Sequence, residues 1–339
     1  MSFAADLGRW YDRAFRDLPW RRTRDPYTVL VSEIMLQQTR VQTVLPYYAR
    51  FIELFPTAEA LARAPEPELL AAWSGLGYYS RARNLQRAAA RVVEQGTFPS
   101  DYAGLRDLPG IGDYTAAAVA SICFDLPYAA VDGNVLRVTA RLTADAGDIM
   151  ARATRERLRS AASSLLDRRN PGRFNQGMME LGATVCLPRN PQCLLCPVSR
   201  HCRALAEGSQ HELPVKRARR QPVRIDETLL VVERRGNLLL HQRDNSESRL
   251  AGFWELPIAG ELPGAVIVET VGEFHHSITH HQYRFTVARA NVGRKPHRFQ
   301  WITADQLEAL PLSTTARKAL QTCKSSPRKS KISQIPPAR

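Results

Sequence analysis

The stretch from Leu108 to Arg137 reads LPGIGDYTAAAVASICFDLPYAAVDGNVLR. It places Gly110 and Gly112 one residue apart, just before a run of small apolar residues that predicts a buried helix. Glycine allows close backbone approach to a ligand, and the amides at a helix N-terminus carry positive partial charge that suits a phosphate. Further along, Asp132 stands among apolar neighbours. The stretch therefore predicts a phosphate-binding turn followed by a candidate catalytic acid, although a Gly-x-Gly pair alone is equally typical of a joint between two packed helices.

The composition indicates a globular protein with a polyanionic partner. The 339 residues are enough for two or three domains, with 44% hydrophobic and 24% charged residues. The net charge of +14 favours nucleic acid or an acidic membrane surface. Apolar runs stay shorter than the roughly 18 residues of a membrane-spanning helix, and the N-terminus lacks an apolar signal core. We therefore expect a soluble cytosolic protein whose six cysteines are metal ligands or free thiols rather than disulfides.

A second candidate acid, Glu33, falls inside an apolar run. Asp25-Pro26 is a helix-start signal, and the pattern predicts a helix from Tyr27 to Gln38. A glutamate in this setting is either half-buried and paired with an arginine or a general acid, because burial disfavours its charged form.

Further along, glycines, tyrosines and arginines interrupt the helical pattern in GLGYYSRARNL, residues 75–85. Arginines can contact phosphates, and aromatic rings can wedge into base stacks. The composition alone leaves it open whether Tyr78 and Tyr79 contact DNA or pack in the core.

Four cysteines then follow in the pattern C-x6-C-x2-C-x5-C: Cys186, Cys193, Cys196 and Cys202. Four thiolates this close together in a cytosolic protein predict a metal site, for which zinc is the generic occupant.

The character of the sequence changes after residue 206. Residues 207–224 are polar and basic and predict a linker. From Ile225 onward the period becomes strand-like, and Arg235-Gly236 predicts the turn of a hairpin. A Nudix hydrolase would carry a glutamate-rich helix after Pro257, and this chain has only isolated glutamates there. The basic segment 323–339 predicts a disordered tail.

These motifs together resemble the MutY-type adenine DNA glycosylases of the endonuclease III, or helix-hairpin-helix, superfamily. The resemblance covers about residues 9 to 320 and rests on WRRTRDPY, SEIMLQQTRV, GLGYYSRARNL, the 108–137 stretch, the cysteine spacing and GFWELP. It implies an α+β multidomain fold. An all-α catalytic region would span 1–206, with a six-helix-barrel module, a helix-hairpin-helix at 105–123 and an iron–sulfur module that includes 186–202. A shortened Nudix-like α+β domain for lesion recognition would span 225–322.

The resemblance also implies a reaction, the excision of adenine mispaired with 8-oxoguanine or guanine in duplex DNA during base excision repair. Glu33 would be the acid, and Asp132 would stabilise the sugar cation or trap it covalently; both roles stay open. Tyr114 stands where strand-cleaving relatives have a lysine, which implies a monofunctional enzyme. The implied residues are, for catalysis, Glu33, Asp132, Tyr114, Asn134 and Glu180; for DNA binding, Gly110, Ile111, Gly112, Gln38, Leu36, Tyr78 and Arg21; and for reading the lesion, Ile278, Thr279 and His280.

The implied cofactor is a [4Fe–4S] cluster held by the four cysteines. The implied partner is double-stranded DNA containing 8-oxoguanine:A mispairs, bound by a monomer in the cytoplasm at a bacterial-type nucleoid, without a membrane. Two alternatives stay open. One is a glycosylase of the same fold with different base specificity, and the other is a non-catalytic DNA-binding protein or a Nudix hydrolase. Intact Glu33 and Asp132 argue against a mere binder, and the missing Nudix helix argues against the hydrolase.

Overall fold

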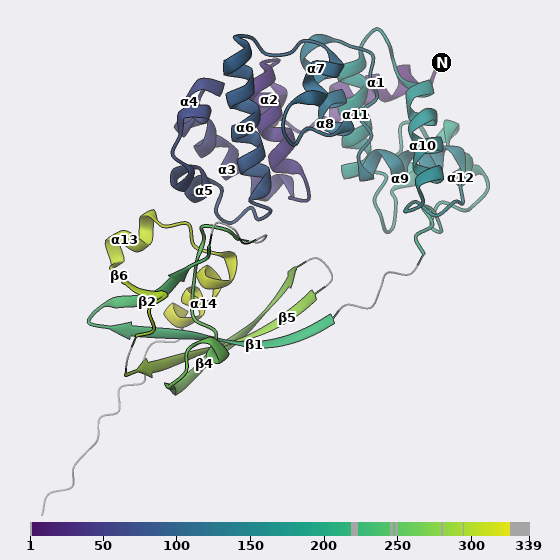
Figure 1. Cartoon of the computed structure of the whole chain (residues 1–339). Helices are drawn as coiled ribbons and strands as arrows, with labels where there is room; N and C mark the ends of the chain where they lie inside the picture. Colours follow the sequence, from purple (N-terminus) through teal and green to yellow (C-terminus); the bar gives the residue numbers. More distant parts are fainter. Residues whose placement is uncertain are drawn as a thin grey trace, which may run out of the picture. The chain divides into compact units, whose positions relative to one another are not determined.

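The computed structural model describes residues 2–217, 223–244, 247, 250–278, 281–293 and 295–325. Contacts divide the chain into two compact units (Figure 1). The first unit comprises Met1–Ala64 with Ser80–Arg219, and the second comprises Pro65–Tyr79 with Arg220–Arg339. We call them the helical unit and the sheet unit. The predicted fold class, a helical glycosylase-type domain followed by an α+β domain, is confirmed.

The helical unit is built almost entirely from α-helices. In chain order they are α1 (Phe3–Ala14), α2 (Pro26–Leu36), α3 (Val41–Leu54), α4 (Ala58–Arg63), α6 (Ser80–Gln95), α7 (Tyr102–Asp107), α8 (Asp113–Phe124), α9 (Gly133–Thr143), α10 (Arg152–Leu165), α11 (Pro171–Thr184) and α12 (Arg203–Ala206), with short 3₁₀ turns η1 (Pro19–Arg21), η2 (Cys193–Leu195) and η3 (Ser199–His201). Helix α11 contacts α1, α8 and α9, and α2 packs on α8. The helices that carry the candidate residues are therefore neighbours in space.

Local sequence explains how the hairpin between α7 and α8 forms. Asp101 caps α7 by accepting a hydrogen bond from the Gly104 amide at 2.9 Å. Gly110 has φ +76°, and a Cβ there would lie 2.5 Å from the Asn84 side chain, so only glycine fits this turn. Gly112 is the N-cap of α8, and the space where its Cβ would stand is open. The N-cap position of α8 therefore carries no side chain, and Asp113 at the first helical position pairs with Arg106 at 2.6 Å.

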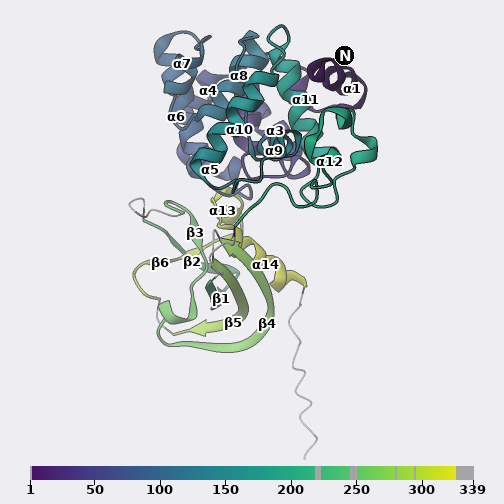
Figure 2. The ribbon, with the colours of Figure 1, turned by 90° about the vertical axis from the view of Figure 1, so that its right-hand side faces the viewer.

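The sheet unit contains α5 (Glu66–Trp73), β1 (Val223–Arg234), β2 (Asn237–Gln242), β3 (Trp254–Glu255), η4 (Ala259–Glu261), β4 (Ala265–Ile278), β5 (His281–Val292), β6 (Phe299–Ile302), α13 (Ala304–Ala309) and α14 (Thr314–Ser325). Among the described residues the strands form one sheet in the order β3-β2-β1-β5-β4, with β6 paired to β2. Strands β1 and β2 are antiparallel, which confirms the predicted hairpin, and its turn residues Arg235 and Gly236 both have positive φ. Strand β5 is parallel to β1 and antiparallel to β4. Helix α14 packs against the curved sheet (Figure 2).

The segment Pro65–Tyr79 belongs to the sheet unit through specific contacts. The Ser74 hydroxyl donates to the carbonyl of Leu312 at 2.9 Å, and the rings of Tyr79 and Phe253 lie 3.8 Å apart. Tyr79 is 6% exposed, whereas its neighbour Tyr78 is 50% exposed with φ +49°. The two tyrosines therefore take opposite roles, one packed in a core and one presented outward.

Pro46 lies inside α3, where it cannot donate the backbone hydrogen bond of a helical residue. Two helix boundaries differ from the sequence expectation. Helix α2 ends at Leu36 rather than Gln38, because Gln37 leaves the helical conformation with ψ 112° and Gln38 then adopts the left-handed conformation with φ +58°. Helix α14 continues to Ser325, into the segment expected to be a disordered tail, and residues 326–339 lie outside the described part.

Across the part of the chain that the structure describes, every helix is too short or too polar to cross a lipid bilayer.

Candidate active site

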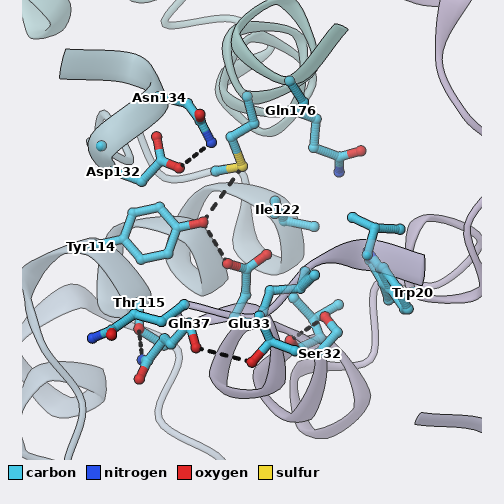
Figure 3. A pocket seen from close by; sticks show the side chains of 18 of the residues that line it. Trp20, Ser32, Glu33, Gln37, Tyr114, Thr115, Ile122, Asp132, Asn134 and Gln176 are labelled. Carbon is cyan, nitrogen blue, oxygen red and sulfur yellow. Dashed lines mark hydrogen bonds between the residues drawn. The ribbon is translucent and has the colours of Figure 1, made fainter. Parts of the chain in front are cut away.

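A pocket of about 680 Å³ opens among α2, α8, α9 and α11 in the helical unit (Figure 3). It brings together most of the residues predicted from sequence. Those that line it are Glu33, Tyr114, Asp132, Asn134, Arg21, Leu36, Gln38, Gly110 and Gly112. Ligand pockets commonly span about 300–1,000 Å³, so this one has room for an extruded nucleotide base.

Glu33 lies on α2 and is 5% exposed. Its Oε2 accepts a hydrogen bond from the Tyr114 hydroxyl at 2.7 Å. Burial raises the pKa of Glu33 to about 7, and the negative charge of Asp132 adds to that rise, while the Tyr114 hydrogen bond and the Arg21 charge oppose it. Figure 3 shows the Tyr114 side chain between Asp132 and Glu33, with its hydroxyl directed at the Glu33 carboxyl. Glu33 therefore holds a proton over much of the range below neutral pH.

Asp132 is the N-cap of α9, and its surroundings favour the carboxylate form more than those of Glu33 do. Its Oδ1 accepts from the Val135 amide at 2.7 Å, and its Oδ2 accepts from Asn134 Nδ2 at 2.9 Å. Burial raises the pKa of Asp132, but these hydrogen bonds and the charge of Arg137 counteract that rise. Because two close carboxyls disfavour double ionisation, the donors around Asp132 direct the negative charge there and leave the proton on Glu33.

Burial and the two neighbouring carboxyls raise the pKa of Tyr114 well above its ordinary value. The phenol therefore stays protonated and acts as a hydrogen-bond donor to Glu33.

Glu180 lies outside the pocket lining and has a different partner set from the one expected of a catalytic acid. It is fully buried and accepts hydrogen bonds from Arg16 Nε at 2.7 Å and from Arg21 Nη2 at 2.7 Å. Burial opposes ionisation of Glu180, but the two arginines outweigh it and lower its pKa. The carboxylate therefore anchors two guanidinium groups that line the pocket. Arg16 was not singled out in the sequence analysis. Its only signal is its contact with Glu180, which lies 164 residues further along the chain.

The hairpin brings two glycines to the pocket at the N-terminus of α8. Ile111, predicted to contact DNA, is instead 5% exposed, and its amide donates to the Leu108 carbonyl at 3.1 Å. Gly110 and Gly112 line the pocket at the N-terminus of α8. The two glycines therefore lie where the pocket meets the first turn of α8, the Ile111 side chain packs in the hairpin, and the phosphate contact stays a prediction.

The four cysteines predicted as metal ligands line one pocket at the edge of the helical unit, together with Arg141 and Gln210. In the described residues, no three His, Cys, Asp or Glu side chains are close enough to hold a metal ion. Arg141 is 2% exposed, and its Nη1 donates to Cys186 Sγ at 3.2 Å. The Oε1 atom of Gln210 is buried there without a hydrogen-bond partner. Four thiols around one pocket are a donor set that fits a thiolate-ligated group.

Arg137 connects the cysteine region to the candidate catalytic carboxylate. Its Nη2 donates to Asn134 Oδ1 at 3.0 Å, and its Nε donates to the Cys186 carbonyl at 2.9 Å. Asn134 in turn holds Asp132. A continuous chain of hydrogen bonds therefore links the residue that begins the cysteine cluster to Asp132.

The other predicted residues, Tyr78 among them, belong to the sheet unit. Ile278 ends β4 and pairs with His281 on β5. Thr279 and His280 lie outside the described residues.

Comparisons with known proteins point to one family. Residues 31–163 match the model of the HhH-GPD superfamily base excision DNA repair proteins, and residues 228–322 match the NUDIX domain model. The adenine DNA glycosylase of Mus musculus is 35% identical, over 94% of this chain and 77% of the mouse protein.

Two solved structures resemble the helical part of the chain. A thermostable thymine-DNA glycosylase is 31% identical with a TM-score of 0.55, covering 60% of this chain and 95% of its own. An endonuclease III in a non-covalent DNA complex is 25% identical with a TM-score of 0.51, covering 60% of this chain and 94% of its own.

Proposed function

Because the chain belongs to the adenine DNA glycosylases of base excision repair, we propose that it excises adenine paired with 8-oxoguanine in duplex DNA by acid-catalysed hydrolysis. The observation that carries this proposal is the pair of carboxyls in the pocket, Glu33 and Asp132, which differ in the number of donors that hold them. Two carboxyls in different protonation states are what hydrolysis of a glycosidic bond requires.

The chemistry follows from that difference. The target nucleotide leaves the base stack and enters the pocket. Glu33 donates its proton to the departing adenine, because an adenine anion is a poor leaving group. Asp132 stays ionised and stabilises the positive charge that develops on the sugar. Glu33, now a carboxylate, activates the attacking water.

Tyr114 bears on whether the enzyme also cleaves the DNA strand. A strand-cleaving relative uses a lysine amine to form a Schiff base with the sugar. The side chain here is a phenol that donates to Glu33 and offers no amine. We therefore propose a monofunctional glycosylase.

We further propose that Cys186, Cys193, Cys196 and Cys202 hold a [4Fe–4S] cluster. Four cysteine thiolates are normal ligands for such a cluster. Two features support a thiolate-ligated group at this place: all four cysteines line one pocket, and Arg141 Nη1 donates to Cys186 Sγ. The choice of a [4Fe–4S] cluster over a zinc ion rests on the cysteine spacing, which resembles that of the family. When bound, the cluster would hold the loop after α11 in place, and the catalytic step would run on Glu33 and Asp132.

If the four cysteines hold one [4Fe–4S] cluster, the purified protein should carry about four irons per chain and show the visible absorbance of an iron–sulfur protein. Cys193→Ser should lower the iron content and weaken binding to undamaged duplex more than it slows excision of bound substrate. Iron analysis, absorbance and single-turnover assays measure these effects. Cys123→Ser, outside the cluster, is the matched control. Stoichiometric zinc without iron after anaerobic purification would show that the cluster assignment is wrong.

The proposed preference for 8-oxoguanine rests on the hairpin between β4 and β5. Ile278, Thr279 and His280 stand where the family carries the loop that reads the lesion. A hydroxyl and an imidazole can both hydrogen-bond to a base edge, and one such contact is worth about 1–3 kcal/mol of discrimination.

The double substitution Thr279→Ala with His280→Ala should reduce the preference for the base opposite adenine. The ratio of the excision rate on 8-oxoguanine:A duplex to that on G:A duplex should fall by roughly tenfold. Single-turnover excision on a panel of mismatched duplexes, developed by hot alkali, measures the ratio. His275→Ala, exposed on β4, is the control. A wild-type protein that released thymine or another base in preference to adenine would instead favour the glycosylase of different specificity. An unchanged ratio in the double variant would place lesion reading elsewhere.

A further inference from the structure

The helix that carries Glu33 ends in an unusual way. Helix α2 stops at Leu36 without a glycine after it, and Gln38 adopts the left-handed conformation with φ +58°. The last carbonyls of any helix lack partners within the helix and carry negative partial charge. A non-glycine residue in the left-handed region also costs free energy, so something nearby must hold this turn in place.

The Arg81 side chain, from the start of α6, lies at this helix end. Its Nη1 lies 2.9 Å from the Ile34 carbonyl oxygen, 3.1 Å from that of Met35 and 2.6 Å from that of Gln37. Its Nη2 donates to the Thr39 hydroxyl at 3.4 Å. Arg81 is 8% exposed, so these contacts are shielded from water. One guanidinium therefore acts as the C-terminal cap of α2.

The residues that Arg81 holds form the rim of the catalytic pocket. Leu36, Gln37, Gln38 and Thr39 all line it. The turn is braced from a second side, because Gln37 Nε2 donates to Thr115 Oγ1 on α8 at 3.3 Å. The Thr39 amide also donates to the Leu36 carbonyl at 3.2 Å. The same guanidinium that ends α2 thus fixes the conformation of the pocket rim.

We propose that Arg81 is a positioning residue that holds the Gln37–Thr39 turn in the conformation that enters DNA. This inference rests on the proposed function and on the DNA-binding role that the family resemblance implies for Gln38. Arg81 acts through the turn and touches neither the base nor the sugar. Its hydrogen bonds to the carbonyls of Ile34 and Met35 also hold the last turn of α2, the helix that carries Glu33.

The geometry needs an arginine. A guanidinium presents several donors in a planar fork, so it reaches three carbonyls and a hydroxyl at once. A lysine ammonium would keep the charge at the helix end but could not donate to all three carbonyls and the hydroxyl. A methionine of similar length would fill the space and donate nothing.

The test compares Arg81→Met, Arg81→Lys and a control, Arg91→Met, which removes an exposed arginine of the same helix that pairs with Glu94. Affinities are measured for a lesion duplex whose adenosine resists excision and for undamaged duplex of the same length. We expect Arg81→Met to weaken lesion binding and to slow single-turnover excision, each by roughly tenfold, the order expected when charge-assisted hydrogen bonds are lost. Binding to undamaged duplex should change less than twofold. Arg81→Lys should restore part of the loss, and Arg91→Met should match the wild type.

A purely structural role predicts a different pattern. Arg81→Met would then lower the melting temperature while leaving the ratio of lesion to undamaged affinity unchanged, and that result would overturn the proposal. Should Arg81→Met fail to fold, Thr39→Val removes one acceptor of the guanidinium without opening a core. It should shift the same ratio in the same direction, and an unchanged ratio there would equally overturn the proposal.

A double substitution separates this inference from the proposed function. If Gln38→Ala alone leaves lesion binding intact, the DNA-binding role of Gln38 is wrong. If Gln38→Ala weakens lesion binding and Arg81→Met does not, the positioning role is wrong. If both weaken it and the double variant is no weaker than the worse single variant, Arg81 acts through the turn, because independent sites would add.

Discussion

Replacing Glu33 with glutamine is expected to abolish adenine release while the variant still binds lesion duplex with nearly wild-type affinity. Glutamine keeps the shape of the side chain and can still accept the hydrogen bond that Tyr114 donates at 2.7 Å. It has no proton of suitable acidity to give to the departing base. Loss of general acid–base catalysis alone costs about 10²–10⁴-fold in rate. Single-turnover excision and a separate binding titration distinguish the two effects.

The matched control for that experiment is Glu94→Gln, the same change at an exposed glutamate on α6. It should excise adenine at the wild-type rate. In the wild type, excision should decline as the pH rises through about 7, because the proton on Glu33 is lost there. A Glu33→Gln variant that kept near-normal single-turnover excision would mean that another group protonates the base.

The same substitution should also change stability, in a direction set by the raised pKa. The folded-state pKa of Glu33 is about 7 against an ordinary 4.5, so the folded protein binds its proton more tightly than the unfolded chain. Below about pH 4.5 Glu33 is protonated in both states and does not lower the free energy of unfolding. Between about pH 4.5 and 7 the unfolded chain loses this proton while the folded protein keeps it, so the free energy of unfolding falls, and above about pH 7 the loss is complete. At about 1.36 kcal/mol per pKa unit, the full penalty is on the order of 3 kcal/mol. Glu33→Gln should raise the melting temperature at pH 8.5 and leave it nearly unchanged at pH 4.5.

Features encoded by neighbouring residues were predictable from the sequence. The Gly110 turn and the Arg235-Gly236 hairpin each depend on a few adjacent residues with strong backbone preferences. The burial of Glu33 also followed from its apolar neighbours along one helix. Local chemistry decides all of these before the chain folds.

Features that depend on distant partners could not be predicted in this way. Arg16 and Arg21 meet Glu180 across more than 150 residues, and no periodicity marks that meeting. The early end of α2 depends on Arg81, 44 residues after Gln37. The parallel pairing of β1 with β5 likewise joins strands separated by three others in the sequence. In each case the physical cause is a tertiary contact that overrides the local pattern.

A second large effect is expected at the hairpin, where Gly112→Asp should weaken binding to every duplex. Gly112 is the N-cap of α8 with φ −94°, which any residue can adopt, and the space around its Cβ position is open. Aspartate is a good N-cap, so the fold should be as stable as the wild type or slightly more so. Its carboxylate would occupy the position where the helix N-terminus attracts a phosphate and would repel that phosphate. Affinity for undamaged duplex at low salt should therefore fall by roughly tenfold or more, with a shallower salt dependence.

Gly112→Asn is the control that isolates the charge. Asparagine has the same shape and also caps a helix, so it should keep the fold and leave most of the DNA affinity intact. Melting temperatures of the three proteins, and binding titrations at several salt concentrations, complete the comparison. If Gly112→Asp binds undamaged duplex as tightly as Gly112→Asn does, then no phosphate sits at the start of α8. The basic surface behind the net charge of +14 would then hold the DNA without the hairpin, and the open N-terminus of α8 would need another explanation.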